Sequence, residues 1–139
     1  MKGFGDLYKS TKRINKKTIH LKEQKIKQAI QFQVEGNIKE AINIYKTVIN
    51  QGCDNPVIFS NYGIILENLG KFQDAEKYFR KAIQFNPKYA VAYSNLGNLL
   101  KDLGKIQEAE LSLRKAIELK PDFAEAHNNL GYILINLGK

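Results

Sequence analysis

The sequence predicts an all-α protein, folded as a right-handed superhelical solenoid of repeated helix–turn–helix units. Three observations lead to this fold class. Seven of the ten glycines recur with a period of 34 residues, and residues 56–89 agree with residues 90–123 at 16 of 34 positions. Within each unit the apolar residues follow helical spacing in two separate segments. A fixed period of this length is typical of solenoids, in which each unit buries its apolar face only against its neighbours.

Each unit is expected to contain two helices joined by a tight turn. In the first helix, Phe59, Tyr62, Gly63 and Leu66 stand at positions i, i+3, i+4 and i+7. A Leu-Gly-Lys turn follows, because glycine tolerates the left-handed conformation just past a helix end. The second helix ends before a proline, since the residue ahead of proline is pushed out of the α region. Small residues such as Gly63 and Gly97 predict the places where the two helices approach closely.

The units differ along the chain. Residues 56–89 and 90–123 are the two regular units, and residues 22–55 follow the pattern more loosely as a degenerate first unit. Residues 124–139 match only the first half of a unit. Together these segments predict seven helices over residues 22–139.

Residues 1–21 are expected to form a flexible, basic leader. The first 27 residues carry nine of the 22 Lys and Arg residues but only two of the 14 acidic ones, so the rest of the chain is nearly neutral. Such a run of charge is typical of a solvated arm. Two alternatives remain at this point: an electrostatic tether to nucleic acid or another anionic surface, and a targeting peptide. Nucleic acid is the less favoured partner, because non-specific attraction to phosphates is weak and sensitive to salt.

Several classes of protein are excluded or disfavoured by composition. The longest apolar run, residues 89–93, has five residues, against the roughly 20 that a membrane span requires. A single cysteine, Cys53, excludes an internal disulfide framework, and the N-terminus lacks the apolar segment of a secretory signal. We therefore expect a reducing, cytoplasmic compartment.

No catalytic constellation is recognisable. His20 and His127 are isolated, and no phosphate-binding or zinc-protease motif occurs. His127 takes the place of the aromatic residues Phe59 and Tyr93, so it is expected to pack in the core. We expect no enzyme activity, no cofactor and no metal.

The repeat unit resembles the tetratricopeptide (TPR) pattern over residues 22–139. The resemblance rests on Tyr93-x2-Leu96-Gly97, Ala109-x3-Leu113 and Pro121, and on the equivalent residues 34 positions earlier. The near-consensus units resemble bacterial-type arrays that precede O-GlcNAc-transferase-like or sulfotransferase domains. The first unit departs from the pattern, with Lys25 in place of the aromatic residue and Cys53 in place of the proline.

The resemblance implies a concave groove lined by the first helix of each unit. Asparagine recurs in this groove at positions 61, 95 and 129, and its amide offers both donors and an acceptor to a peptide backbone. The same residues could instead hydrogen-bond the neighbouring repeat, and both interpretations stay open. The candidate peptide-binding residues are Asn61, Asn95, Asn129, Ser60, Ser94, Asn128, Asn98, Lys101 and Asp102.

The groove does not resemble the subclass of TPR domains that clamps a C-terminal carboxylate with Lys, Arg and Asn. Ile26, Val91 and Asn95 stand where the basic clamp residues would be needed. A carboxylate clamp is therefore not expected.

The sequence as a whole predicts a protein–protein interaction scaffold that binds a peptide or protein segment in this groove. An alternative is the substrate-recruiting N-terminal region of a glycosyltransferase or sulfotransferase. At the other end, the half unit presents Ile133, Leu134 and Leu137, which one neighbour cannot bury together. We therefore expect either a truncated leader of a longer protein or self-association through this half repeat.

Overall fold

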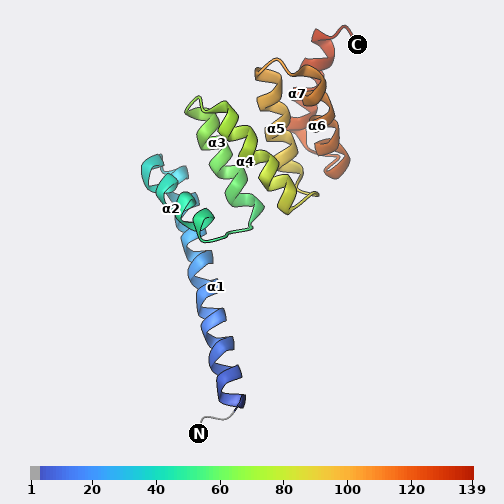
Figure 1. Cartoon of the computed structure of the whole chain (residues 1–139). Coiled ribbons are helices and arrows are strands. Elements are labelled where there is room, and N and C mark those ends of the chain that lie inside the picture. Colours follow the sequence, from blue (N-terminus) through green and yellow to red (C-terminus); the bar gives the residue numbers. More distant parts are fainter. Residues whose placement is uncertain (1–3) are drawn as a thin grey trace. The chain divides into compact units, whose positions relative to one another are not determined.

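A computed structural model of the chain describes the backbone of residues 4–139 and the side chains from Lys9 onward. This part of the chain forms seven helices and no strand, which confirms the predicted all-α class. Two compact units divide the chain at Cys53 and Asp54, with α1 and α2 in the first and the remaining helices in the second (Figure 1). The helices are α1 (Phe4–Val34), α2 (Ile38–Asn50), α3 (Pro56–Asn68), α4 (Phe72–Phe85), α5 (Ala90–Asp102), α6 (Ile106–Leu119) and α7 (Ala124–Asn136).

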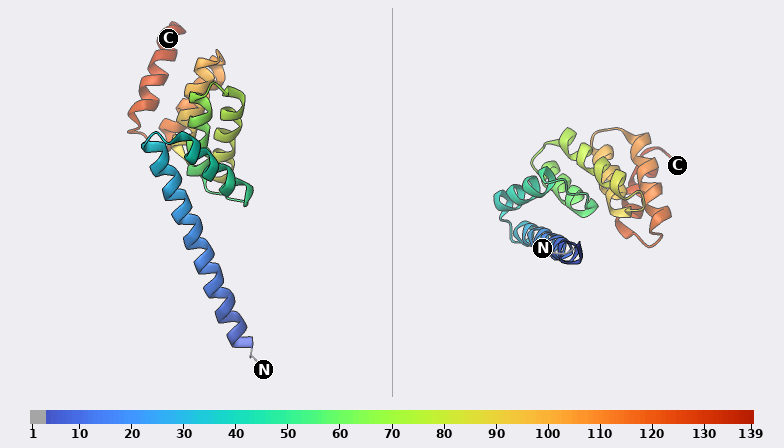
Figure 2. Two further views of the ribbon diagram at one scale, coloured as in Figure 1. Left: turned by 90° about the vertical axis from the view of Figure 1, so that its left-hand side faces the viewer. Right: turned by 60° about the horizontal axis from the view of Figure 1, so that its bottom comes forward.

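The first helix begins much earlier than the repeat pattern predicts. Residues 4–21, expected as a flexible leader, form the first half of α1, and the helix continues without a break through residue 21 (Figure 2). No glycine or proline lies between Gly5 and Gly36, so nothing in this stretch interrupts a helix. Residues 1–3 of the expected leader lie outside the described residues.

The degenerate first unit keeps the packing of small residues. Ala29 of α1 and Ala41 of α2 are completely buried, as is Tyr45, whose hydroxyl donates a hydrogen bond to Gln33 Oε1 at 2.7 Å. Ala29 and Ala41 occupy the positions of Gly63 and Ala75 in the next unit. The helix pair therefore forms although the sequence has departed from the consensus.

The Leu-Gly-Lys turns end α3 and α5 in the same way. Gly70 and Gly104 both have φ of +73°, a conformation that suits glycine because it has no Cβ. The Lys71 N–H donates to the Leu66 carbonyl at 2.8 Å, and the Gly70 N–H donates to Glu67 at 2.9 Å. This pair of hydrogen bonds is the Schellman motif, which satisfies carbonyls at the helix end.

Close approach of the paired helices depends on glycine inside α3 and α5. A Cβ at Gly63 would lie 2.6 Å from the Phe79 ring, and one at Gly97 would lie 2.6 Å from Leu113 Cγ. Both distances are shorter than van der Waals contact, so the side chains of α4 and α6 fill the space that a larger residue would need. The predicted role of these two glycines is confirmed.

Aromatic side chains fill the layer between α3 and α4. Phe59 is 2 % exposed and stacks on Phe85 with ring centroids 5.1 Å apart, while Tyr62 meets the edge of Tyr78 at 4.8 Å. Offset and edge-to-face pairs of this kind add about 0.5–1.5 kcal/mol beyond their burial.

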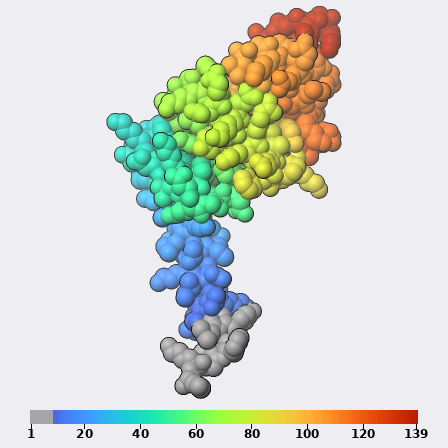
Figure 3. Space-filling view, in the orientation of Figure 1, coloured from blue at the N-terminus to red at the C-terminus, as the bar shows by residue number. Residues whose placement is uncertain are grey.

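The unit from Asp54 to Lys139 has two sides. The backbones of the first helices of successive repeats lie close together, α3 with α5 and α5 with α7, whereas the backbones of α4 and α6 hardly approach one another. The stack is therefore tighter along α3, α5 and α7, and this side lies on the inside of its curve. The space-filling view shows the helices of this unit following one another from α3 (green) to α7 (red) (Figure 3).

Candidate functional site

The candidate groove is the surface of α3, α5 and α7 that faces away from α4 and α6; we call it the A-helix face. All nine residues predicted for peptide binding lie on these three helices. Asn61, Asn98 and Asn129 are half-buried, and Asn128 and Asp102 are exposed. These side chains have surface that a ligand could reach.

Ser60 and Ser94 do not belong to the accessible part of this face. They are 1 % and 0 % exposed, because their position on the helix points toward the next repeat. Ser60 Oγ accepts a hydrogen bond from Asn95 Nδ2 at 3.0 Å. The two serines are therefore packing residues in this structure, and the groove is better described without them.

Asn95 therefore makes a hydrogen bond between neighbouring repeats. This agrees with the structural interpretation of the recurring asparagines, in which they bond the next repeat. The equivalent contact one unit later is not formed: Ser94 Oγ is buried without a hydrogen-bond partner. The amides of Asn61 and Asn129 make no side-chain hydrogen bond to any residue that the structure describes. The three asparagines, identical in sequence, are consequently not equivalent in the fold.

Lys101 organises the polar groups at the centre of the face. Its ammonium group donates to Asn98 Oδ1 at 2.9 Å and lies 3.4 Å from Asp102 Oδ1. The same nitrogen lies 5.4 Å from the centre of the Tyr132 ring, within the range of a cation–π interaction. Lys101 therefore connects α5 with α7, and Tyr132 is a member of the site that the sequence analysis did not single out.

Glu67 is a second residue of this face that was not among the candidate peptide-binding residues. Burial raises the pKa of Glu67 above its ordinary value of 4.5, and the negative charges of Asp102 and Glu125 raise it further against the opposing effect of Lys101. The carboxyl group of Glu67, on α3, therefore interacts electrostatically with charged groups on both α5 and α7. The A-helix face thus contains three acidic groups, Glu67, Asp102 and Glu125, beside one lysine, Lys101, and it is acidic overall.

The opposite side of the unit is occupied by ion pairs. Arg80 bonds Glu76 at 2.7 Å within α4 and Glu108 at 3.1 Å on α6, and Lys105 bonds Glu76 at 3.1 Å. Burial alone would raise the pKa of Glu76, but hydrogen bonds from Arg80 and Lys105 outweigh it, so the pKa is lowered. These partners satisfy one another, which is typical of a solvated structural surface.

The residues that could support catalysis are engaged elsewhere or isolated. His127 is exposed rather than packed in the core, and its Nε2 lies 2.7 Å from the Pro121 carbonyl oxygen; the expectation of a core role is wrong, because the second helix that would cover this position is absent from the described chain. Cys53 is half-buried. Among the described residues, no group of three His, Cys, Asp or Glu residues is arranged to hold a metal ion.

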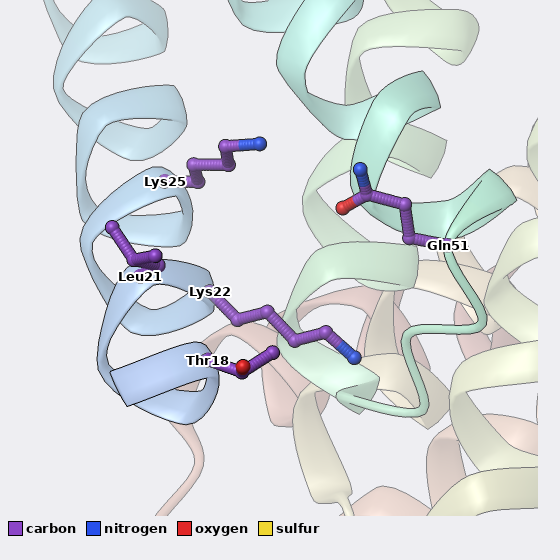
Figure 4. A pocket seen from close by; sticks show the side chains of 5 residues that line it. All are labelled: Thr18, Leu21, Lys22, Lys25 and Gln51. Carbon is purple, nitrogen blue, oxygen red and sulfur yellow. The ribbon is translucent and has the colours of Figure 1, made fainter. Parts of the chain in front are cut away.

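A pocket of about 320 Å³ lies within the first unit, between α1 and the residue after α2. It is lined by Thr18, Leu21, Lys22, Lys25 and Gln51, and the two lysine side chains extend from α1 toward the side of Gln51 (Figure 4). The sequence analysis did not predict this pocket. Across residues 4–139, every helix is either too short or too polar to span a lipid bilayer.

The fold and the site together define a helical repeat scaffold with a polar inner face. Comparison with protein families gives the same result at the level of sequence: residues 56–89 and 78–110 match models of the tetratricopeptide repeat, and residues 97–138 match a model of the TPR repeat. The chain is a tetratricopeptide repeat protein. A comparison with curated protein sequences gives no match.

Solved structures of TPR domains are similar over most of the chain. The first TPR domain of Spaghetti (RPAP3), bound to the HSP90 peptide SRMEEVD, has a TM-score of 0.78 and 29 % identity, and covers 85 % of this chain and 94 % of that one. The second TPR domain of human RPAP3, in complex with an HSP70 peptide, has a TM-score of 0.74 and 25 % identity, covering 82 % and 96 %. A Thermobaculum terrenum O-GlcNAc transferase mutant has a TM-score of 0.76 and 26 % identity; the match covers 81 % of this chain but 22 % of that longer one.

Proposed function

We propose that this protein is a non-catalytic scaffold whose A-helix face binds an extended peptide segment of another protein. The observation that carries the proposal is the pair of unengaged amides at Asn61 and Asn129, which stand on either side of α5 in a face made of polar side chains. Each amide can donate to a peptide carbonyl and accept from a peptide N–H. The TPR domains of RPAP3, which bind peptides from HSP90 and HSP70, support this use of the face.

The charge of the face favours a neutral or basic segment. Glu67, Asp102 and Glu125 outnumber Lys101, so a ligand with Lys or Arg side chains would gain favourable interactions. An acidic C-terminal peptide would meet repulsion instead, and the basic residues of a carboxylate clamp are replaced by Ile26, Val91 and Asn95. We expect the HSP90 peptide SRMEEVD to bind at least about a hundredfold more weakly than a basic peptide selected on this protein.

The test is a peptide-display selection on the 139-residue chain, followed by affinity measurements on variants. Asn61→Ala combined with Asn129→Ala should weaken capture of the selected peptide by at least about tenfold, because each lost hydrogen bond to the backbone contributes about 0.5–1.5 kcal/mol. The matched control is Gln73→Ala with Gln107→Ala, which removes two exposed amides from α4 and α6. Equal binding by both double variants would refute the proposed site.

Asn95 is left unchanged in that experiment because its amide is bonded to buried Ser60. Replacing it would mix an effect on stability with an effect on binding. We further propose, from the single cysteine of the sequence, that the protein acts in a reducing compartment such as the cytoplasm.

A further inference from the structure

The first half of α1 carries basic side chains along one side of the helix. Residues 9–20 contain five Lys and Arg residues, one His and no Asp or Glu. Since an α-helix has about 3.6 residues per turn, the spacing of these six residues places them on one side of α1. We call them the basic stripe; they are Lys9, Lys12, Arg13, Lys16, Lys17 and His20, and all six are exposed.

The basic stripe faces away from α2, the helix against which α1 packs. Lys27 follows Lys9 by 18 residues, which is about five helical turns, so the two lysines lie on the same line of α1. Lys27 is exposed. Ala29 lies about 200° further round the helix and is completely buried. α2 therefore covers the side of α1 opposite to the stripe, and the first part of α1 extends past it (Figure 1).

The cations of the stripe have no anionic partner among the residues that the structure describes. The ion pairs of this part of the chain lie between residues 76 and 139, where Arg80, for example, bonds Glu76 at 2.7 Å. In the stripe, residues of like charge stand four positions apart, as Lys12 and Lys16 do, and such pairs repel one another. An anionic partner outside the chain would relieve this repulsion.

Two adjoining hollows follow the stripe along α1. The first, of about 280 Å³, is lined by Lys9, Lys12, Arg13 and Lys16, and the second, of about 350 Å³, is lined by Arg13, Lys16, Lys17 and His20. Both linings lack carboxylates and apolar residues, so this side of α1 is not a core face that another helix of the fold would cover. Lys and Arg side chains donate strong, charge-assisted hydrogen bonds to phosphate and carboxylate oxygens. The hollows therefore suit a row of anionic groups.

We propose that the basic stripe docks this protein on the surface of a membrane that contains anionic lipids, with α1 lying along that surface. The headgroups of such lipids form an extended, flat array of negative charges. All the cations on one side of a straight helix can reach a flat array together. Because α2 lies on the opposite side of α1, it does not stand between the stripe and the lipid.

A nucleic-acid duplex fits the stripe less well than a membrane does. A helix that enters the major groove has phosphates on both of its sides and contacts base edges with further side chains. The cations of α1 lie on one side only. The stripe contains a single arginine, Arg13, and no Asn or Gln, which are the residues that contact base edges most often.

The charge of the stripe is sufficient for reversible docking. Each Lys or Arg close to an anionic membrane strengthens binding about fivefold, and salt weakens this attraction by screening. The proposal does not depend on the A-helix face, because the stripe lies in the first unit of the chain and that face lies in the second.

The test is co-sedimentation of the 139-residue chain with lipid vesicles. The chain should bind vesicles of phosphatidylcholine with about 30 % phosphatidylserine, but not vesicles of phosphatidylcholine alone. Arg13→Gln combined with Lys16→Gln should weaken this binding about thirtyfold, since two charges are lost. The matched control is Lys39→Gln with Lys46→Gln, which removes two exposed lysines from α2 in the same unit and should change binding less than about threefold. Equal binding to both kinds of vesicle, or equal losses in the two double variants, would overturn the proposal.

An introduced tryptophan tests the orientation of α1. The sequence contains no tryptophan, so the fluorescence of a single one reports on its own position. His20→Trp places it in the stripe, and Ile14→Trp places it on the other side of α1, at a residue that is 64 % exposed. Anionic vesicles should shift the emission of His20→Trp to shorter wavelength and leave that of Ile14→Trp nearly unchanged. A larger shift for Ile14→Trp would overturn the proposed orientation.

Competition distinguishes the membrane from other polyanions. A DNA duplex and polyglutamate are added separately to chain bound on anionic vesicles, at about 0.1 M salt. Neither should release the chain at a concentration of charge equal to that of the anionic lipid. Release by the duplex would assign the stripe to nucleic acid, and release by polyglutamate would assign it to an acidic protein segment; either result would overturn the membrane proposal. Circular dichroism of each variant confirms that it is folded.

Discussion

Gly97 and Gly131 are equivalent in the repeat, but only Gly97 is tightly packed against a neighbouring helix. Replacing each by alanine therefore tests the packing of the fold directly. Gly97 and Gly131 occupy the same position in α5 and α7. The added methyl group at residue 97 would lie 2.6 Å from Leu113 Cγ, 3.0 Å from its Cδ2 and 3.3 Å from the Ala109 carbonyl oxygen. At residue 131 it would meet no atom within 4 Å.

The expected free energies follow from these distances. Alanine inside a helix is more favourable than glycine by about 0.5–1 kcal/mol, and Gly131→Ala should gain this amount. Gly97→Ala gains the same but forces Leu113 and the α5–α6 contact apart, at a cost of about 1–3 kcal/mol. The two variants should therefore differ by about 1–3 kcal/mol in their free energy of unfolding, with Gly131→Ala the more stable.

Thermal unfolding followed by circular dichroism provides the assay, with both variants measured at the same protein concentration. A difference of this size corresponds to about 5 °C or more in Tm for a domain of this length. Leu113→Ala should relieve part of the damage in the Gly97→Ala background, because the two changes affect one contact and should not add. Equal Tm values for the two glycine variants would refute the assigned packing.

Two further predictions concern polar groups. Asn95→Ala leaves the Ser60 hydroxyl buried without its donor and should cost about 1–3 kcal/mol of stability in urea unfolding, with Ser60→Ala recovering part of it; strictly additive losses would contradict the hydrogen bond. The raised pKa of Glu67 means that the folded state binds this proton more tightly than the unfolded state does. Glu67 therefore lowers the stability of the fold above its raised pKa, and this loss disappears as the pH falls below 4.5. Glu67→Gln should therefore raise Tm at pH 7 but not at pH 3, whereas Glu76→Gln, which removes a carboxylate of lowered pKa, should lower Tm at pH 7; the same sign for both would contradict these assignments.

The all-α repeat fold could be predicted because its signals are local and recur. Helical spacing, the Leu-Gly-Lys turns and the prolines act within a few residues of one another. Their repetition every 34 residues then indicates how the units stack. The close contacts at Gly63 and Gly97 follow from the same repetition, since small residues recur wherever two helices must approach.

The start of α1 could not be placed from the same signals. The basic composition of residues 1–21 suggested a solvated arm, but charge does not prevent a helix when glycine and proline are absent. The repeat pattern gave no information here because residues before 22 have no counterpart in it.

The site was predicted in outline and not in detail. The sequence placed the candidate residues on α3, α5 and α7, but it could not show that Ser60 and Ser94 are buried. Neither could it distinguish Asn95, which is bonded to Ser60, from Asn61 and Asn129. These differences depend on which side chains of the neighbouring repeat lie beside each asparagine, and those side chains differ among the three. The interactions of Glu67 and Tyr132 could not be predicted for the same reason, as they cross from one helix to another.

The central claim is that the A-helix face binds a peptide segment, and NMR spectroscopy of a ¹⁵N-labelled chain tests it most directly. The side-chain NH₂ groups of Asn61, Asn98 and Asn129 give resonances of their own, which report on the face without any substitution. Titration with the peptide selected on this protein should shift these signals together with the backbone amides of α3, α5 and α7. Shifts confined to α4 and α6, with the three asparagine side chains unchanged, would contradict the claim.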